Sequence, residues 1–362
     1  MIILQLIILT SLTIISFTLV DLNLTLLNWQ PYLSLQSQLT QLGYYNRPIN
    51  GNILLVLCLA LVANFLVFTI NAAKLSWRQI KFLALATVLI LLPSYSMFSY
   101  DFFNYMFDAR IMTLHHQNPY TSTALQFPQD EWTRFMHWTH RTYPYGPSWL
   151  LITTIPSILG FTKFLPTFIM FKILFGLSFL FATLAIHKII CELTPDDRLK
   201  KFSIVLFITN PLLLIDGLIS PHLDLVMGAL GLWGVYYAIR SQSSNKLKSS
   251  IISVLLILSS AGVKFATAPW ILVSNKIFIN HFGYRALTFS IILLSIIMAI
   301  AQAVHLSQYQ PWYGILIAMT LPLVTPYIRM KYLFLAGILL ALPIWIYINY
   351  AYIGVMVNPI LP

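Results

Sequence analysis

The feature that most constrains this chain is a series of long apolar segments, most of them long enough to cross a lipid bilayer. Only 9% of its 362 residues are charged, whereas a soluble domain carries roughly 25%. So few charges cannot cover a water-exposed surface, and in lipid a helix pairs its own backbone groups. The sequence therefore predicts membrane helices near residues 1–20, 52–70, 82–99, 165–187, 202–219, 224–240, 287–304, 311–328 and 332–352.

Two further apolar segments do not fit a single crossing. Gly262, Lys264 and Pro269 interrupt the run 251–273, which favours a hairpin of two short helices. The run 147–160 is only about 14 residues long, below the roughly 17–25 that a crossing needs. We expect this shorter segment to re-enter the membrane or to lie along its surface.

Basic residues between the apolar runs predict the orientation, because cytoplasmic loops carry an excess of Lys and Arg. The net charge of +11 therefore indicates membrane loops, with no nucleic-acid partner expected. If the loops 71–81, 188–201, 240–249, 274–286 and 329–331 are inside, the N-terminus is inside, loop 100–147 is outside, and 14 of the 21 basic residues are cytoplasmic. These are Lys74, Arg78, Lys81, Lys188, Arg198, Lys200, Lys201, Arg240, Lys246, Lys248, Lys276, Arg285, Arg329 and Lys331.

The sequence shows no soluble domain and no secretion or metal signature. The first apolar run lacks a basic start and a cleavage site, which predicts a retained span. Cys58 and Cys191 are far apart, and no metal-ligand spacing is present. We expect one all-α polytopic domain over 1–362, with about 11 transmembrane helices. The outer segment 100–160 would carry interfacial or re-entrant helices, and the plasma membrane is the expected location.

The outer loop 100–147 is polar and aromatic, and it holds four of the ten acids and four of the eight histidines. Residues 101–114 have helical periodicity, typical of a helix lying on the membrane interface. Asp108 and Arg110 would then project toward a cavity or water. Asp101, at the start of this helix, could cap it or act as a general base.

Two turn motifs follow in the same loop: NPY, which includes Asn118 and Tyr120, and YPYGP, which includes Tyr143 and Tyr145. Pro and Gly fix tight bends, so both motifs could simply fold the loop. Their aromatic rings could also stack on a sugar ring or belong to an interfacial aromatic belt.

Ionisable residues inside apolar segments are costly and mark candidate sites. Lys264 could snorkel to the interface or bind a lipid phosphate. His222 and Asp224, after NPLLLIDGLIS, could cap a turn or line a site. Lys172 is better explained as structural. The turn QPWYG, which contains Gln310, Trp312 and Tyr313, could anchor the interface or wall a lipid groove.

In their order along residues 100–315 these motifs resemble the polyprenol-phosphate-mannose-dependent mannosyltransferases of the GT-C superfamily. The sequence SPHLD keeps the His and Asp of that family's GHND-like motif but lacks its Gly and Asn. The resemblance implies a GT-C-like helical bundle and inverting transfer of a sugar, with mannose the expected one. It also implies a polyprenyl-phosphate donor, a glycan or lipid-linked acceptor, and chemistry on the non-cytoplasmic face.

The same resemblance places the catalytic base at Asp101. Lys264 would stabilise the departing phosphate, helped by Arg110, Arg141 or His222. No metal or other cofactor is firmly implied. The expected substrate-binding residues are Tyr105, Asp108, Arg110, Asn118, Tyr120, Arg141, Tyr143, Tyr145, His222, Asp224, Lys264, Gln310, Trp312 and Tyr313.

Three other functions are compatible with a polytopic chain. A transporter or flippase for a lipid-linked polar substrate would show discontinuous helices in both halves and an inverted repeat, whereas this sequence shows one broken helix and no repeat. A ligase or polymerase of lipid-linked glycans would place its large loop late in the chain. A catalytically inactive scaffold would not need Asp101, His222 and Lys264 together.

Overall fold

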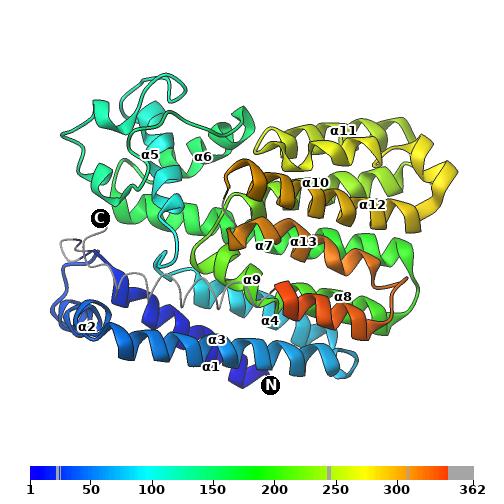
Figure 1. Ribbon diagram of the computed structural model, residues 1–362, viewed down its shortest axis with the longest axis horizontal. Helices are drawn as coiled ribbons and strands as arrows, with labels where there is room; N and C mark the ends of the chain where they lie inside the picture. Colours follow the sequence, from blue (N-terminus) through cyan, green and yellow to red (C-terminus); the bar gives the residue numbers. More distant parts are fainter. Residues whose placement is uncertain (22–23, 25, 243–245, 308–309, 341–362) are drawn as a thin grey trace.

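The structure is a computed structural model that describes residues 1–21, 24, 26–242, 246–307 and 310–340. This part of the chain contains helices and no strand, which confirms the all-α fold class. In Figure 1 the long helices run roughly side by side as a bundle. Their bounds are α1 (Ile2–Ser16, continued by η1, Phe17–Leu19), α3 (Arg47–Ile70), α4 (Trp77–Leu91), α7 (Phe164–Leu193), α8 (Asp197–Ile208), α10 (Asp224–Arg240), α11 (Lys246–Ala261) and α12 (Lys276–His305).

Shorter helices connect the long ones and build the outer segment. They are α2 (Gln30–Thr40), η2 (Gln41–Tyr45), η3 (Ala72–Lys74), α5 (Asp101–Thr113), η4 (Ala124–Gln126), η5 (Glu131–Phe135), α6 (Pro147–Leu159), α9 (Pro211–Leu214), η6 (Ile215–Ile219), η7 (Phe265–Leu272), η8 (Pro311–Gly314), α13 (Ile315–Thr320), η9 (Leu321–Val324) and a last helix, Met330–Leu340.

Four helical segments of the described chain are long and apolar enough to cross a membrane: Ile2–Leu19, Arg47–Ile70, Phe164–Leu193 and Lys276–His305. The bent pair α8 and α9–η6 would make a fifth. The remaining apolar helices are shorter, so the expected number of about 11 spans stays a prediction. Part of the predicted run 332–352 lies outside the described residues.

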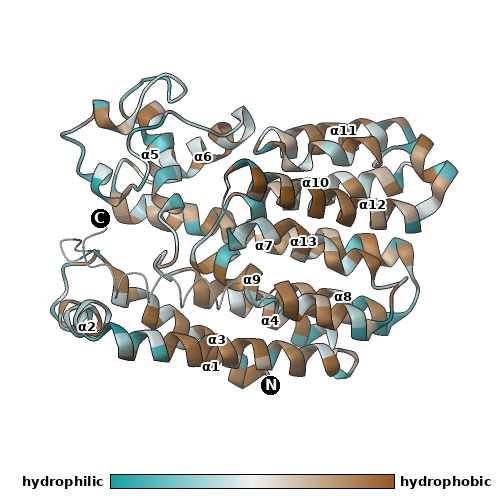
Figure 2. Cartoon of the chain, viewed as in Figure 1, coloured by the Kyte–Doolittle hydropathy of each residue, from teal (hydrophilic) through white to brown (hydrophobic). Residues whose placement is uncertain are grey.

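The burial pattern of the bundle is that of a protein in lipid. Almost every side chain of α10 is buried, including Leu232 and Val235, so this helix forms the centre. On the outer helices, by contrast, Val56, Leu255 and Leu293 are each more than half exposed. Figure 2 shows hydrophobic residues along the bundle helices and hydrophilic ones on the outer segment and the connections. Exposed apolar faces of this extent require an apolar solvent.

Three predicted spans differ from the structure. The run 311–328 becomes the shorter apolar helix Pro311–Val324. The run 82–99 becomes α4, which ends at Leu91, and the chain then leads without helix into α5. The run 202–219 is broken after Ile208, where Asn210 caps α9 and Pro211 begins it with a 46° bend. Proline lacks a backbone N–H, so it starts the new helix instead of continuing the old one.

The segment 251–273 is a hairpin of two short helices, as predicted. Helix α11 ends at Ala261, Gly262 and Val263 turn the chain, and Lys264 precedes η7. The two arms of the hairpin, α11 and η7, pack against each other. The chain therefore enters and leaves the hairpin at the same end of the bundle, and the tip lies at the other end (Figure 1). The tip therefore brings Lys264 to the end occupied by α5 and α6.

Helix α5 confirms the predicted helix near 101–114 but not its expected surface position. Phe102, Met106 and Ile111 are buried, and so are the polar side chains of Asn104 and Asp108. The segment after α5 folds back over the helix, and η4 and η5 contact it. Asp108 is therefore enclosed by the outer segment and does not project toward water.

Loops that were predicted to be cytoplasmic lie together at the end of the bundle opposite α5 and α6. Trp77 donates from Nε1 to Asp197 Oδ1 at 3.0 Å, and its ring packs edge-on against His187. This contact joins the connection between α3 and α4 to the connection between α7 and α8. Figure 1 shows these connections at the end of the bundle away from α5 and α6.

Candidate functional site

The predicted site residues converge where four elements meet: the start of α5, the start of α10, the hairpin tip before η7, and η8. The broken span explains part of this convergence, because η6 ends at Ile219 and a short turn reverses the chain into α10. That turn carries His222, and α10 begins with Asp224. Both side chains are buried inside the bundle's end.

His222 joins the turn before α10 to the start of α5. Its Nδ1 lies 3.1 Å from the carbonyl oxygen of Asp216, and its Nε2 lies 3.2 Å from Ser99 Oγ. A carbonyl only accepts, so Nδ1 carries the hydrogen of the neutral ring and Nε2 accepts from the Ser99 hydroxyl. Ser99 Oγ also accepts the backbone N–H of Asp101 at 3.2 Å. One serine thus links His222 to the predicted base.

The imidazole of His222 also stacks on the indole of Trp312, with ring centroids 4.1 Å apart and planes 15° apart. This contact brings Trp312 of η8 to His222, and the expected roles of the QPWYG turn, an interfacial anchor or the wall of a lipid groove, stay predictions. Stacking and the two polar contacts together hold the ring in one orientation. A fixed imidazole at a site needs such partners on both nitrogens.

Lys264 forms the charged contact of the site. Its Nζ lies 3.0 Å and 3.3 Å from the two carboxylate oxygens of Asp224. It also lies 5.4 Å from the ring centroid of Tyr313, a cation–π distance. The Asp224 side chain is only 3% exposed, whereas that of Lys264 is 24% exposed. The Lys264 side chain is therefore only partly covered, whereas its Asp224 partner is buried.

Asp101 occupies the first turn of α5 and is partly exposed. Burial raises the pKa of its carboxyl, and Asp224 raises it further, while Arg141, Lys264 and His137 act to lower it. A raised pKa makes a carboxylate a stronger proton acceptor. The charges that act on Asp101 come from the outer segment, the hairpin tip and α10, so these elements share one electrostatic environment.

A wall of tyrosines lines the α5 side. The ring of Tyr105 meets that of Tyr145 at 5.5 Å, Tyr145 meets Tyr143 at 5.5 Å, and Tyr143 meets Tyr120 at 5.2 Å, all edge-on. Arg141 lies over the ring of Tyr145 at 5.9 Å. The turn motifs NPY and YPYGP therefore pack on each other and on α5.

Asn118 has a local structural role in this wall. Its Oδ1 accepts the backbone N–H of Tyr120 at 3.0 Å, and the neighbouring Pro119 carbonyl accepts the N–H of Tyr143 at 2.9 Å. The hydroxyl of Tyr120 donates to the Tyr145 carbonyl at 3.2 Å. These bonds fold the loop, as the turn interpretation of both motifs predicted.

The YPYGP segment also docks directly on the hairpin tip. The backbone N–H of Gly146 donates to Val263 O at 3.1 Å, and that of Ser148 donates to Gly262 O at 3.0 Å. A Cβ on Gly146 would lie 2.1 Å from the Gly262 carbonyl oxygen. Only glycine allows this approach, which carries Tyr145 and Lys264 to the same place.

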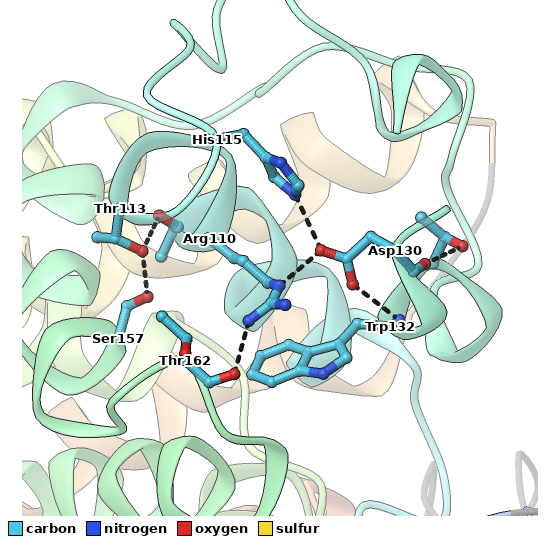
Figure 3. Close-up of polar contacts among 9 residues, drawn as sticks. Arg110, Thr113, His115, Asp130, Trp132, Ser157 and Thr162 are labelled. Carbon is cyan, nitrogen blue, oxygen red and sulfur yellow. Dashed lines mark hydrogen bonds and ion pairs between the residues drawn. The ribbon is translucent and has the colours of Figure 1, made fainter. Parts of the chain in front are cut away.

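One of the predicted residues, Arg110, lies apart from this cluster. It sits more than two turns further along α5, where its Nε contacts Asp130 Oδ2 at 2.7 Å and Nη1 donates to Thr162 O at 2.9 Å (Figure 3). Asp108 is enclosed in the outer segment, where burial raises its pKa to about 7, while Arg141 acts to lower this pKa and Asp101 to raise it. Gln310 directly precedes η8, and no described residue bonds its buried Oε1.

Several residues of the site were not singled out from sequence. Ser99 has no pattern that marks a bridging hydroxyl, and the pairing of Gly146 with Gly262 depends on two distant segments. Asp216 carried a usable signal, because it is an acid inside an apolar run. It is 5% exposed, its Oδ2 has no hydrogen-bond partner among the described residues, and its carbonyl holds His222.

Lys172 is structural, as expected. It is buried in α7, and its Nζ donates to Ser94 Oγ at 2.9 Å, to Ile219 O at 3.1 Å and to the carbonyl oxygen of Leu218. These carbonyls lie at the end of η6, just before the His222 turn. In the described part of the chain, no three His, Cys, Asp or Glu side chains lie close enough to hold a metal ion together.

The comparisons with known proteins identify one relationship. The family described as alpha-(1->6)-mannopyranosyltransferase, N-terminal domain, matches residues 9–280, which contain most of the cluster just described. No curated protein and no solved structure matches the chain. The family match supports a mannosyl transferase over a transporter.

Proposed function

The chain belongs to the alpha-(1->6)-mannopyranosyltransferase family, and on that premise we propose that it transfers mannose from a polyprenyl-phosphate carrier to a glycan or glycolipid acceptor. The observation that carries this proposal is the convergence of Asp101, His222, Asp224 and Lys264 at one end of a bundle with apolar outer faces. A carboxylate and a partly exposed lysine at the end of a membrane bundle suit a sugar carried on a lipid phosphate.

The proposed reaction is a single displacement. The acceptor hydroxyl gives its proton to Asp101, and its oxygen forms the new bond to the anomeric carbon. The bond from that carbon to the phosphate oxygen breaks, and its electron pair leaves with the phosphate. Such a displacement inverts the anomeric carbon, so an α-linked product requires a β-linked donor.

Lys264 is the proposed phosphate partner. Its charge is balanced by Asp224, and its side chain is partly exposed, so a donor phosphate would reach it from the exposed part. A phosphate is a stable leaving group and needs no general acid, so one carboxylate suffices. This differs from glycoside hydrolysis, in which two carboxyl groups act on the bond.

We place this reaction on the non-cytoplasmic face of the plasma membrane, with the N-terminus inside. The basic connections support this orientation, because they lie at the opposite end of the bundle from α5 and the site. The segment 100–160 then forms an outer unit of one transmembrane domain. Of the tyrosine wall, Tyr145 and Tyr120 are not fully buried and could offer the acceptor stacking surfaces.

The test is a transfer assay on purified protein with polyprenyl-phosphate mannose, polyprenyl-phosphate glucose and nucleotide mannose as donors. Asp101→Asn should lower turnover at least about 100-fold, the usual size of a general-base contribution, with donor binding retained. Asp196→Asn is the matched control, because this exposed helix cap keeps its capping oxygen and loses only the charge.

Wild-type turnover by Asp101→Asn would remove Asp101 as the base. Transfer from the nucleotide sugar alone would remove the lipid-linked donor. The configuration of the product linkage, read by NMR, decides between inversion and retention.

A further inference from the structure

A second concave site lies in the outer segment, away from the cluster at Asp101. It is a cavity of about 640 Å³ between the end of α5 and the segment around η5. The volume is within the usual range for ligand sites in proteins. Its lining includes Arg110, His115, Phe127, Asp130 and Trp132.

A buried carboxylate makes the wall of this cavity rigid. Asp130 Oδ2 contacts Arg110 Nε at 2.7 Å and His115 Nε2 at 2.9 Å, and its Oδ1 accepts the backbone N–H of Trp132 at 3.1 Å (Figure 3). The Asp130 side chain is 5% exposed. Burial alone would raise the pKa of Asp130, but these hydrogen bonds hold it below its ordinary value. The cavity is thus preformed.

Flat surfaces frame the same cavity. The imidazole of His115 stacks on the ring of Phe127, with centroids 4.1 Å and planes 22° apart. The guanidinium of Arg110 lies 3.9 Å from the ring centroid of Trp132. Flat apolar faces beside fixed polar groups suit a ligand that presents both C–H faces and hydroxyls.

Three polar side chains on the cavity make no side-chain hydrogen bond or ion pair with the described residues. They are Gln126, Gln129 and Glu131, and all three are exposed to solvent. Amide groups both donate and accept, and a carboxylate accepts, so together they match the hydroxyls of a neutral polyol. Asp130 and Glu131 offset the charge of Arg110, which leaves no excess positive charge for a phosphate.

We propose that this cavity is a remote saccharide site that binds a part of the acceptor glycan distant from the reacting hydroxyl. The inference rests on the proposed function, and mannose oligosaccharides serve as its probes. Arg110 follows Asp101 by nine residues on α5, which is about 13.5 Å along the axis and half a turn out of phase, so the two side chains start from opposite sides of the helix. An acceptor that reaches both must pass around α5, which requires a chain of several sugar units. Binding energy from a remote part of a substrate then serves to position its reacting end.

The experiment compares acceptors of two lengths. The double variant Gln126→Ala, Gln129→Ala should raise KM about tenfold for a mannohexaose acceptor and leave the KM for a mannobiose acceptor unchanged. Asp130 is left intact, because its removal would collapse the wall. Gln117→Ala is the matched control, since it removes an exposed amide of the same segment that does not line the cavity.

An equal change in KM for both acceptors, or no change for either, overturns the inference. Direct titration of mannohexaose onto the wild-type protein and the double variant separates this inference from the proposed function, because it needs no turnover. Binding by the wild type that the double variant loses supports the saccharide site even if no mannosyl transfer is found. Equal binding by both proteins overturns it.

Discussion

At the scale of single residues, His222 connects the two sides of the site. Its Nε2 accepts a hydrogen bond from the Ser99 hydroxyl, and the oxygen of that hydroxyl accepts one from the Asp101 backbone N–H. The imidazole also stacks on Trp312. The imidazole therefore fixes where α5 begins relative to η8. Its role in the proposed reaction is to position Asp101, with Lys264 left to face the phosphate.

Replacing Lys264 tests the phosphate role. We expect Lys264→Met to lower kcat by about 100- to 1,000-fold, because a fixed charge that stabilises a transition state has an effect of that order. Lys264→Arg should retain part of the activity, since it keeps the charge. The measurement is donor-dependent turnover in the purified protein.

Lys163→Met is the control for this change, because it removes an exposed lysine next to α7 that makes no side-chain bond in the described structure. Melting curves of all three variants separate lost chemistry from lost folding. If Lys264→Met turns over donor at the wild-type rate while remaining folded, Lys264 does not stabilise the leaving phosphate.

Asp108 gives a pH-dependent prediction for stability. Its pKa is about 7 in the folded protein, against about 4 in an unfolded chain. Between these values the folded state binds more protons than the unfolded state, so stability falls as pH rises through this window. Asp108→Asn has no carboxyl to titrate and so does not lose this stability as pH rises. The Tm of the variant minus the Tm of the wild type should therefore be larger near about pH 8 than near about pH 4.5.

The same melts on Asp196→Asn provide the reference, because that carboxyl is exposed at the far end of the bundle. A gain in Tm for Asp108→Asn that is equal at both pH values would show that Asp108 is not held protonated by burial.

At the scale of elements, the site depends on segments that break regular structure. The break before α9 creates the His222 turn, and Lys172 holds the carbonyls that end η6. The break between α11 and η7 presents Lys264. Irregular backbone at membrane depth is tolerated only where it is buried in protein or lines a cavity, and both breaks are packed in this way.

The prediction at this scale concerns the close contact between Gly146 and Gly262. Gly146→Ala would place a methyl group 2.1 Å from the Gly262 carbonyl oxygen. Relief of such an overlap costs about 1–3 kcal/mol and shifts backbone. We expect a lower Tm and reduced transfer, because Tyr145 moves away from the Lys264 tip.

Gly217→Ala serves as the comparison, since its added methyl group would meet Leu225 at 3.5 Å, an ordinary contact. Unchanged Tm and activity in Gly146→Ala would show that the two segments do not need this close approach. Tm and transfer rate are measured on the same preparations.

At the scale of the whole molecule, the apolar bundle separates two polar ends. The outer segment and the candidate site occupy one end, and most of the basic connections occupy the other (Figures 1 and 2). An orientation with the basic end in the cytoplasm follows the positive-inside rule. The lipid-linked donor would then reach Lys264 from the outer leaflet.

This orientation is testable with a membrane-impermeant maleimide. Cys191 is exposed near the basic end, whereas Cys58 is buried. In intact cells Cys191 should stay unlabelled until the membrane is permeabilised. Gln117→Cys, made in a chain lacking both native cysteines, should be labelled from outside. Labelling of both positions in intact cells would refute the proposed topology.

The sequence alone determined the membrane class, the all-α fold and the orientation hypothesis, because hydropathy and loop charge are local properties. It also marked His222, Asp224 and Lys264, since ionisable groups in apolar segments are rare. The family resemblance that the ordered motifs indicated is confirmed by the match over residues 9–280.

Only the tertiary structure decided which of these residues meet. Arg110 and Asp101 share α5, but Arg110 is held by Asp130 and Asp101 lies beside the His222 turn. The burial of Asp108 and the bridge through Ser99 depend on segments far apart in the chain. Helical periodicity shows which side chains share a face, but only the packing of distant segments determines whether that face is covered.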